Sequence, residues 1–239
     1  MIQVSHLTKM FGKIRAVNDV SFSVAQGEAF ALLGPNGSGK STTLKCLAGL
    51  VAPSQGEIRV NGVDLLRDPQ RAKSFLSYLP QRIEFHDSLT AREVMEFYCR
   101  LRKLPLSRID NLLCGSRFDF DGFADRRIGE FSGGMLQRLG LAIACLPDAP
   151  VLVLDESTVG LDPAGVVQFR EFLTELKRKG KTIIFATHVL NDVEQLADRI
   201  AVFVEGRLIA LETISAMRGK WIENDRRLSM EEIYLRYLQ

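Results

Sequence analysis

A glycine-rich segment near the start of the chain ends in a lysine and a serine. The pattern G-x-x-x-x-G-K-[ST] is met by eight consecutive residues, and one threonine follows: Gly34, Pro35, Asn36, Gly37, Ser38, Gly39, Lys40, Ser41 and then Thr42. Backbone N–H groups can converge on phosphate oxygens only where side chains are small, which accounts for the glycines. In this pattern the lysine carries its charge to the β- and γ-phosphates, and the serine hydroxyl can bind Mg²⁺. The segment predicts binding of a nucleoside triphosphate.

Two acidic residues follow an apolar run in the second half of the chain. Asp155 and Glu156 come directly after Val151–Leu154, which has the pattern of a buried strand. Because neighbouring strand residues point to opposite faces, the two carboxylates are expected to do different work. We assign Asp155 to Mg²⁺ and Glu156 to polarising an attacking water. The alternative is that the two acids are solvated residues of a turn. The phosphate-binding pattern earlier in the chain disfavours this alternative.

The elements that must position these residues can be inferred from hydrophobic periodicity. Residues 1–30 alternate as strands do, and Thr90 and Glu93 form a capping box that opens a helical region. Expected strands lie at 29–33, 57–60, 74–79, 151–154, 182–186 and 200–204. Expected helices lie at 40–50, 90–104, 107–113, 135–146, 163–179 and 190–196, and Ser229 and Glu232 cap a terminal helix. Strands that alternate with helices predict an α/β fold with a largely parallel sheet.

Composition sets further bounds on the molecule. The chain has 239 residues, 46% of them apolar and 25% charged, which suits one large globular domain. Its net charge of +2 gives no reason to expect nucleic acid as a partner. It begins without a signal-peptide pattern and holds no apolar run long enough to cross a bilayer, so we expect a cytoplasmic protein. Cys46, Cys99, Cys114 and Cys145 form no CxxC pair, which favours buried free thiols over zinc ligands or disulfides.

Taken together, the motifs resemble those of the ATP-binding cassette (ABC) ATPases, over essentially the whole chain. Four residues stand where that family has the start of its LSGGQ signature, and a methionine replaces the glutamine: Phe131, Ser132, Gly133, Gly134 and Met135. The resemblance implies that this signature closes over the γ-phosphate of ATP bound to the opposite subunit. Small residues at a helix N-terminus suit an anion for the same reason as in the glycine-rich segment.

The resemblance assigns roles to four more residues. Phe11 would stack on adenine, Gln81 would sense Mg²⁺ and couple to a membrane subunit, Asp162 would lie in the D-loop, and His188 would contact the γ-phosphate. Each also has a plain structural alternative: a strand aromatic, a turn residue, a helix cap and a structural histidine. Ser157 departs from the family pattern, because a proline commonly follows the catalytic glutamate there.

The fold and the assembly implied by the resemblance can be stated in full. We expect one domain, 1–239, with a P-loop NTPase core built on a mainly parallel sheet, an N-terminal antiparallel β subdomain, an α-helical subdomain inserted at about 82–146 and a short C-terminal helix at about 229–238. The catalytic residues would be Glu156, His188 and Gln81. The residues that bind Mg²⁺ would be Ser41, Gln81 and Asp155. Two ATPase subunits, identical or different, would pair head to tail around two ATPs beneath separate ABC transmembrane (permease) subunits, on the inner face of the membrane.

Within the family, the chain looks most like subunits of ABC-2-type exporters. The stretches 79–86 and 229–235 are also similar to ATPases of copper-processing systems linked to nitrous oxide reductase maturation. The main alternative is a soluble ABC ATPase that powers assembly of a protein or metal-cluster scaffold without a membrane partner. An apolar groove beside Gln81 would favour the transporter subunit, and a polar one the soluble ATPase. A non-hydrolysing regulatory module is a third possibility, against which Glu156 and His188 weigh.

Overall fold

A six-stranded sheet forms the centre of the protein. The computed structural model describes residues 1–115, 122–158, 160–220, 222–223 and 226–237. The strand order is β10-β9-β3-β8-β7-β6. Their bounds are β3 (Ala29–Leu33), β6 (Leu76–Leu79), β7 (Val151–Asp155), β8 (Thr182–Thr187), β9 (Arg199–Val204) and β10 (Arg207–Thr213). Five strands are parallel to their neighbours, and only β10 runs antiparallel, against β9. The mainly parallel sheet is confirmed.

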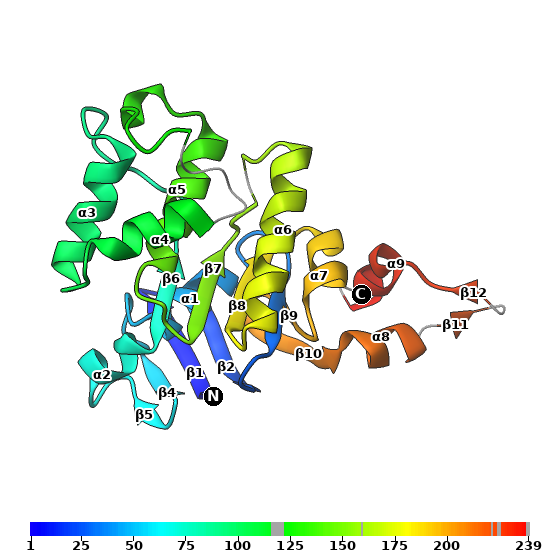
Figure 1. The fold of residues 1–239 in the computed structure, drawn as a ribbon. Coiled ribbons are helices and arrows are strands. Elements are labelled where there is room, and N and C mark those ends of the chain that lie inside the picture. Colours follow the sequence, from blue (N-terminus) through cyan, green and yellow to red (C-terminus); the bar gives the residue numbers. More distant parts are fainter. Residues whose placement is uncertain (116–121, 159, 221, 224–225, 238–239) are drawn as a thin grey trace.

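A second sheet is antiparallel and holds the start of the chain. Its order is β2-β1-β4-β5, with β1 (Ile2–Phe11), β2 (Ile14–Val24), β4 (Gln55–Val60) and β5 (Val63–Asp64). A short ribbon of β11 (Ile222–Glu223) and β12 (Arg226–Arg227) stands apart from both sheets near the end of the chain (Figure 1). The antiparallel β subdomain expected near the N-terminus is thus present.

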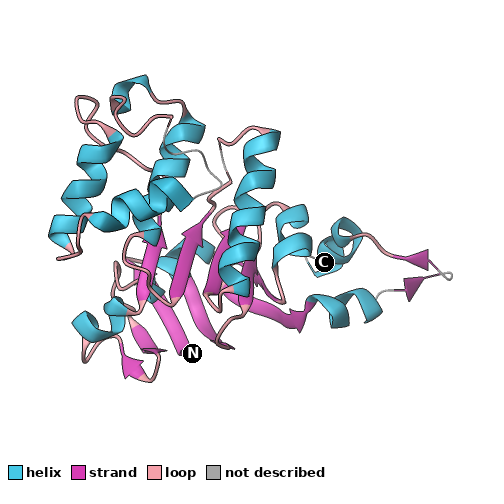
Figure 2. Cartoon of the chain, viewed as in Figure 1, coloured by secondary structure: helices cyan, strands magenta, loops and turns pink. Residues whose placement is uncertain are grey.

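The central strands are mostly apolar because helices cover both faces of the sheet (Figure 2). Every residue of β3, β7 and β8 is buried. Successive side chains enter different cores: Ala31 and Leu33 pack in one hydrophobic cluster, and Phe30 and Leu32 in the other. The flanking helices of the core are α1 (Lys40–Leu47), α6 (Pro163–Arg178) and α7 (Leu190–Leu196).

Most remaining helices lie between β6 and β7 in the chain or at its end. Those between the strands are α3 (Ala91–Leu101), α4 (Ser107–Gly115), the 3₁₀ helix η1 (Ile128–Glu130) and α5 (Gly133–Cys145), and α8 (Ile214–Lys220) and α9 (Met230–Tyr237) follow later. The predicted capping box at α3 is confirmed in both directions, since Thr90 accepts from the Glu93 N–H and the Glu93 carboxylate accepts from the Thr90 N–H. Ser229 and Glu232 make the same reciprocal pair at α9.

Several boundaries differ from the sequence-based prediction. The strand expected at 74–79 begins only at Leu76, because α2 (Pro69–Ser74) precedes it, capped by Asp68 with a proline in its first turn. Helix α5 begins at Gly133 rather than Met135, since the Ser132 side chain caps it. Strand β10 and helix α8 were not predicted at all.

The free-thiol prediction is confirmed for three of the four cysteines. Cys46 and Cys99 are buried and Cys145 is half-buried, all unpaired, while the side chain of Cys114 lies outside the description. Among the described residues, the helices are all too short or too polar to cross a bilayer.

A stacked aromatic pair, in the hydrophobic cluster that contains Phe30 and Leu32, gives a test of this packing. Phe30 is 0% exposed and stacks on Phe22 at 5.1 Å between ring centroids. We expect Phe30→Ala to lower the free energy of unfolding by about 3–5 kcal/mol, because it leaves a cavity in a packed core. Phe97→Ala, at a residue that is 59% exposed, is the matched control and should cost about 0.5 kcal/mol or less. Urea unfolding followed by circular dichroism measures both, and equal losses would contradict this description of the core.

Candidate nucleotide-binding and hydrolysis site

The glycine-rich segment forms the loop 34–39 between β3 and α1, as predicted. Two of its glycines are required by close contacts. Gly39 has φ +100°, and a Cβ there would lie 2.5 Å from the Ala16 carbonyl oxygen. A Cβ at Gly34 would lie 2.3 Å from the Phe203 carbonyl oxygen. The loop is therefore seated tightly against neighbouring backbone, and only glycine fits at these two positions.

Lys40, the first residue of α1, is almost completely buried, with 4% of its surface exposed. Its Nζ donates to the carbonyl oxygens of Gly34 at 2.8 Å and Pro35 at 3.1 Å, and lies 3.8 Å from Glu156 Oε1. Burial lowers the pKa of Lys40, and the nearby negative charges of Glu156 and Asp155 oppose that shift. The ammonium is thus held within the loop, next to one of the two predicted carboxylates.

Asp155, the last residue of β7, contacts Ser41, which follows Lys40 in α1. The Ser41 hydroxyl donates to Asp155 Oδ1 at 2.7 Å, and the Tyr78 hydroxyl donates to Oδ2 at 3.1 Å. Burial, and then the charge of Asp155, raise the pKa of Tyr78, so this phenol stays protonated and donating. The pairing of Ser41 with Asp155 brings together two oxygen donors of the kind Mg²⁺ binds, so the residues fit the ion.

Tyr78 was not among the predicted site residues. It lies on β6, where it pairs with Val153 of β7, and this register brings its hydroxyl to the carboxylate. In the sequence it has only the pattern of a strand aromatic.

Glu156 lies just beyond the strand and has a left-handed backbone, with φ +47°. Its N–H still donates to the Ala186 carbonyl of β8 at 3.1 Å. Gln81 Nε2 donates to Glu156 Oε2 at 2.8 Å, and His188 Nδ1 lies 3.7 Å from Oε1. Because the strand ends at Asp155, the alternation of faces stops there, and both carboxylates reach the same site.

Gln81, Glu156 and the glycine-rich loop with Lys40 and Ser41 border a cavity of about 400 Å³. Phe11 at its edge is half-exposed, with Lys9 Nζ 4.9 Å from the ring centroid. Ser38 Oγ is buried and has no hydrogen-bond partner among the described residues, as a group awaiting an anion would be. The lining residues are Phe11, Ala16, Asn36, Gly37, Ser38, Gly39, Lys40, Ser41, Thr42, Gln81 and Glu156.

The predicted signature is not part of this cavity. Ser132 caps α5 by accepting from the Met135 N–H at 3.3 Å, and Ser132 and Gly133 are exposed. Phe131 instead packs edge-on against Phe123. The chain thus brings together the phosphate-binding loop, Gln81 and the two carboxylates, and leaves Phe131–Met135 outside the cavity.

Comparison with known proteins identifies the family. The model of the family described as "ABC transporter" matches residues 17–159. The chain belongs to the ABC transporter family. Within that family it is an ATP-binding subunit and an ATPase.

Individual ABC proteins resemble the chain along nearly all of its length. The Nod factor export ATP-binding protein I of Burkholderia orbicola (strain AU 1054) is 38% identical over 98% of this chain and 76% of that protein. A solved ATP-binding subunit of an ABC transporter is 29% identical, covers 100% of both chains and superposes with a TM-score of 0.89. A dimeric ATP-binding cassette bound to ADP and Pi is 24% identical and shares the fold, with a TM-score of 0.80 over 90% of this chain and 99% of its own. The copper-processing interpretation gains no support from these relatives.

Neither Asp162 nor His188 is among the residues that line the cavity. Asp162 caps α6 by accepting from the Gly165 N–H at 2.9 Å, so the helix-cap alternative describes a contact that is present. His188 follows β8 and is half-exposed, 3.7 Å from the carboxylate of Glu156. Their roles toward nucleotide stay predictions.

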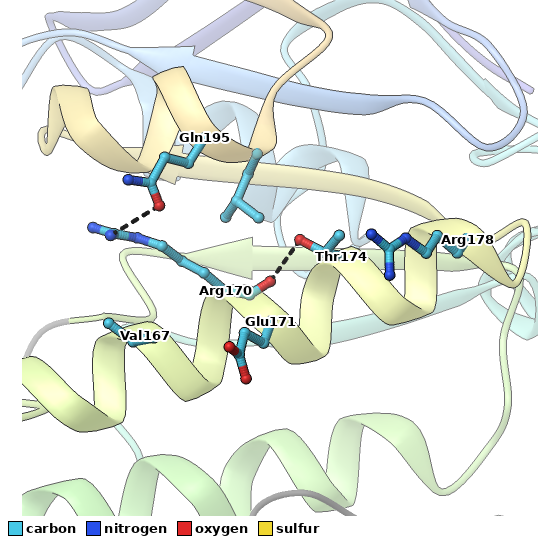
Figure 3. A pocket seen from close by; sticks show the side chains of 7 residues that line it. Val167, Arg170, Glu171, Thr174, Arg178 and Gln195 are labelled. Atoms are coloured by element: carbon cyan, nitrogen blue, oxygen red, sulfur yellow. Dashed lines mark hydrogen bonds between the residues drawn. The ribbon is translucent and has the colours of Figure 1, made fainter.

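A separate groove of about 380 Å³ lies between α6 and α7 (Figure 3). Arg170 crosses it from α6 and donates to Gln195 of α7 at 3.2 Å. The same guanidinium pairs with the buried carboxylate of Asp192 at 2.6 Å, which also accepts from Thr158. This network fixes the helix that follows His188, and the groove holds none of the predicted site residues.

The buried lysine makes a pH-dependent prediction for the nucleotide-free protein. An unfolded lysine keeps its proton to about pH 10.4, whereas burial lowers the pKa of Lys40 in the folded state. Between these two pKa values the unfolded chain binds more protons, so the stability of the wild type should rise with pH relative to Lys40→Met. Urea unfolding at pH 7 and pH 10 measures the difference, with Lys45→Met, at an exposed position of α1, as control. A difference that falls with pH would rule out this effect of burial.

Proposed function

We propose that the chain is the ATP-hydrolysing subunit of an exporter whose membrane-spanning subunits are separate proteins. The observation that carries the proposal is the position of Gln81. Its amide donates to Glu156 at 2.8 Å, and the residues directly after it line a groove with both apolar and charged side chains. Gln81 thus connects a hydrolytic carboxylate with a surface suited to a partner. In this proposal residues 1–239 are one ATPase domain, with its helical part at about 82–146 and its C-terminal helix at about 229–238.

The contacts of the site support a division of labour in hydrolysis. Lys40 can exchange its two carbonyl partners for the β- and γ-phosphate oxygens of ATP, and the glycine-rich loop offers its backbone N–H groups to the same oxygens. Glu156, with Gln81 on one carboxylate oxygen, is placed to polarise the water that attacks the γ-phosphorus, and ADP leaves. His188 would contact the γ-phosphate and Phe11 would stack on adenine.

Mg²⁺ fits at the junction of α1 and β7. Ser41 and Asp155 would hold it, with Gln81 as a further oxygen donor. When bound, Mg²⁺ neutralises the charge that develops on the phosphates. Before it binds, the hydroxyl of Ser41 keeps the Asp155 carboxylate in place.

The exposed signature supports pairing of two ATPase subunits. A single chain surrounds ATP on one side only, because Ser132 and Gly133 are exposed and lie outside the cavity. A second subunit, identical or similar, can bring its own α5 N-terminus to the phosphates if the two pair head to tail about a twofold axis. A solved cassette that shares the fold, at 24% identity, is dimeric with ADP and Pi bound, in keeping with pairing of two subunits.

The groove beside Gln81 favours a membrane partner over the soluble assembly ATPase. Its volume is about 190 Å³. Part of its lining is apolar or aromatic (Tyr78, Leu79, Pro80, Ile83, Phe85, Tyr98, Gly140, Ile143 and Ala144), and the charged residues Arg82, Glu84 and Arg102 form the rest. Such a groove suits the apolar face of a short helix, here one from a permease subunit at the cytoplasmic membrane surface. The relative named for Nod factor export supports the outward direction of transport.

Removal of the lysine charge tests nucleotide binding. We expect Lys40→Ala to raise the Kd for ATP roughly 10- to 150-fold, because charge-assisted hydrogen bonds contribute about 1.5–3 kcal/mol. Lys45→Ala, at an exposed lysine of the same helix, is the control and should bind as the wild type does. Isothermal titration calorimetry measures both, and wild-type affinity in Lys40→Ala would overturn the assignment of the loop.

Removal of the carboxylate tests hydrolysis and assembly together. Glu156→Gln should lower kcat about 10²- to 10⁴-fold, as loss of a general base does, and should retain ATP in a stable dimer. A phosphate-release assay and size-exclusion chromatography measure the two effects. Normal hydrolysis by this variant would remove Glu156 from its role.

The trapped dimer also identifies the class of partner. Tagged Glu156→Gln, purified with ATP from detergent-solubilised membranes, should retain a polytopic membrane protein in near-equal amount. The same dimer carrying Phe85→Asp in the groove should lose that protein and keep its ATP-dependent dimer, whereas Leu235→Asp, at an exposed leucine of α9, should keep both. Recovery with a soluble scaffold protein instead would favour the assembly ATPase.

A further inference from the structure

A buried glutamine on the signature helix contacts the loop that carries Glu156. Gln137 lies in the second turn of α5 and is 5% exposed. Its Nε2 donates to the Ser157 carbonyl oxygen at 2.7 Å. A primary amide is costly to bury without a partner, and the other buried residues of α5 are apolar or glycine. This hydrogen bond is therefore the feature that accounts for a glutamine at this position.

The bond fixes the peptide group that joins Ser157 to Thr158, one residue beyond Glu156. On the other side, the Glu156 N–H donates to Ala186 of β8 at 3.1 Å. Between these two anchors Glu156 has φ +47°, a conformation that a non-glycine residue keeps only where its surroundings hold it. Ser157 takes part in this hydrogen bond through its carbonyl oxygen. Its buried hydroxyl has no hydrogen-bond partner among the described residues. The backbone around Glu156 is thus held by a β8 carbonyl at its N–H and, one residue further on, by Gln137 at the Ser157 carbonyl.

We propose that Gln137 is a positioning residue for Glu156. It acts through the Ser157 carbonyl and is not among the residues that line the cavity beside the glycine-rich loop. The inference rests on the proposed role of Glu156 in hydrolysis. Because α5 begins at Gly133, directly after Ser132, the helix that presents the signature to one ATP also holds the carboxylate that acts on the other.

The decisive variant removes the N–H donor and keeps the length of the side chain. Gln137→Met should lower kcat roughly 10- to 100-fold, since a small misplacement of a reacting group has effects of this size. KM for ATP should stay within about twofold, because the contacts of Lys40 and of the loop 34–39 are untouched. Gln168→Met, the same substitution at an exposed residue of α6, should change neither constant. An unchanged kcat in Gln137→Met would overturn the proposal.

A second measurement separates positioning from general damage to α5. In the Glu156→Gln background, Gln137→Met should leave the ATP-dependent dimer intact, because the signature at Ser132 does not need this hydrogen bond. Loss of the dimer would show that Gln137 supports the signature helix instead, and would also overturn the proposal. Circular dichroism checks folding first, and Gln137→Leu is the second variant if methionine at this position prevents folding.

The wild type and Glu156→Gln alone are measured in the same assay. If Glu156→Gln hydrolyses ATP normally, the proposed function of Glu156 fails irrespective of Gln137. If Glu156→Gln is inactive and Gln137→Met is fully active, only the inference about Gln137 fails.

Discussion

The buried ammonium of Lys40 is the charge on which the arrangement of the site depends. A cation removed from water needs close partners, and here they are two carbonyl oxygens of its own loop and the carboxylate of Glu156. The bond from Ser41 to Asp155 adds a second pairing, one residue later in α1 and one residue earlier in the segment that ends β7. Helix α1 and the end of β7 are thus joined at two successive positions. A phosphate can replace the carbonyl partners while the lysine stays where it is.

The sequence alone predicts the parts of the site whose chemistry requires particular residue types at short spacing. The glycine-rich loop and the acidic pair after an apolar strand are of this kind, and the structure brings them together. Tyr78 and Gln137 have no such local signal. Their contacts join residues 77 and 20 positions apart, respectively, and exist only because β6 pairs with β7 and α5 packs beside the end of that strand. The nucleotide contacts of Phe11, Asp162 and His188 stay predictions.

The elements that the sequence predicts well are those whose burial is strong. Strands β3, β7 and β8 are buried on both faces, so an apolar run is sufficient to identify them. Helix α2 has six residues and mostly exposed side chains, and β10 is an edge strand whose residues are exposed or half-buried, so neither leaves a clear hydrophobic pattern. The early start of α5 has another cause. Glycines disfavour helix, but the Ser132 cap outweighs their low propensity.

The position of β8 in the sheet has a consequence for biosynthesis. This strand lies between β3, which leads into the phosphate-binding loop, and β7, which ends at Asp155. Both flanking strands leave the ribosome before β8, which lies between them in the finished sheet. The bond between Ser41 and Asp155 thus joins two segments whose spacing strand follows both in the chain and ends at residue 187. A nascent chain therefore carries every residue of the phosphate-binding loop well before it carries the strand that completes the order β3-β8-β7.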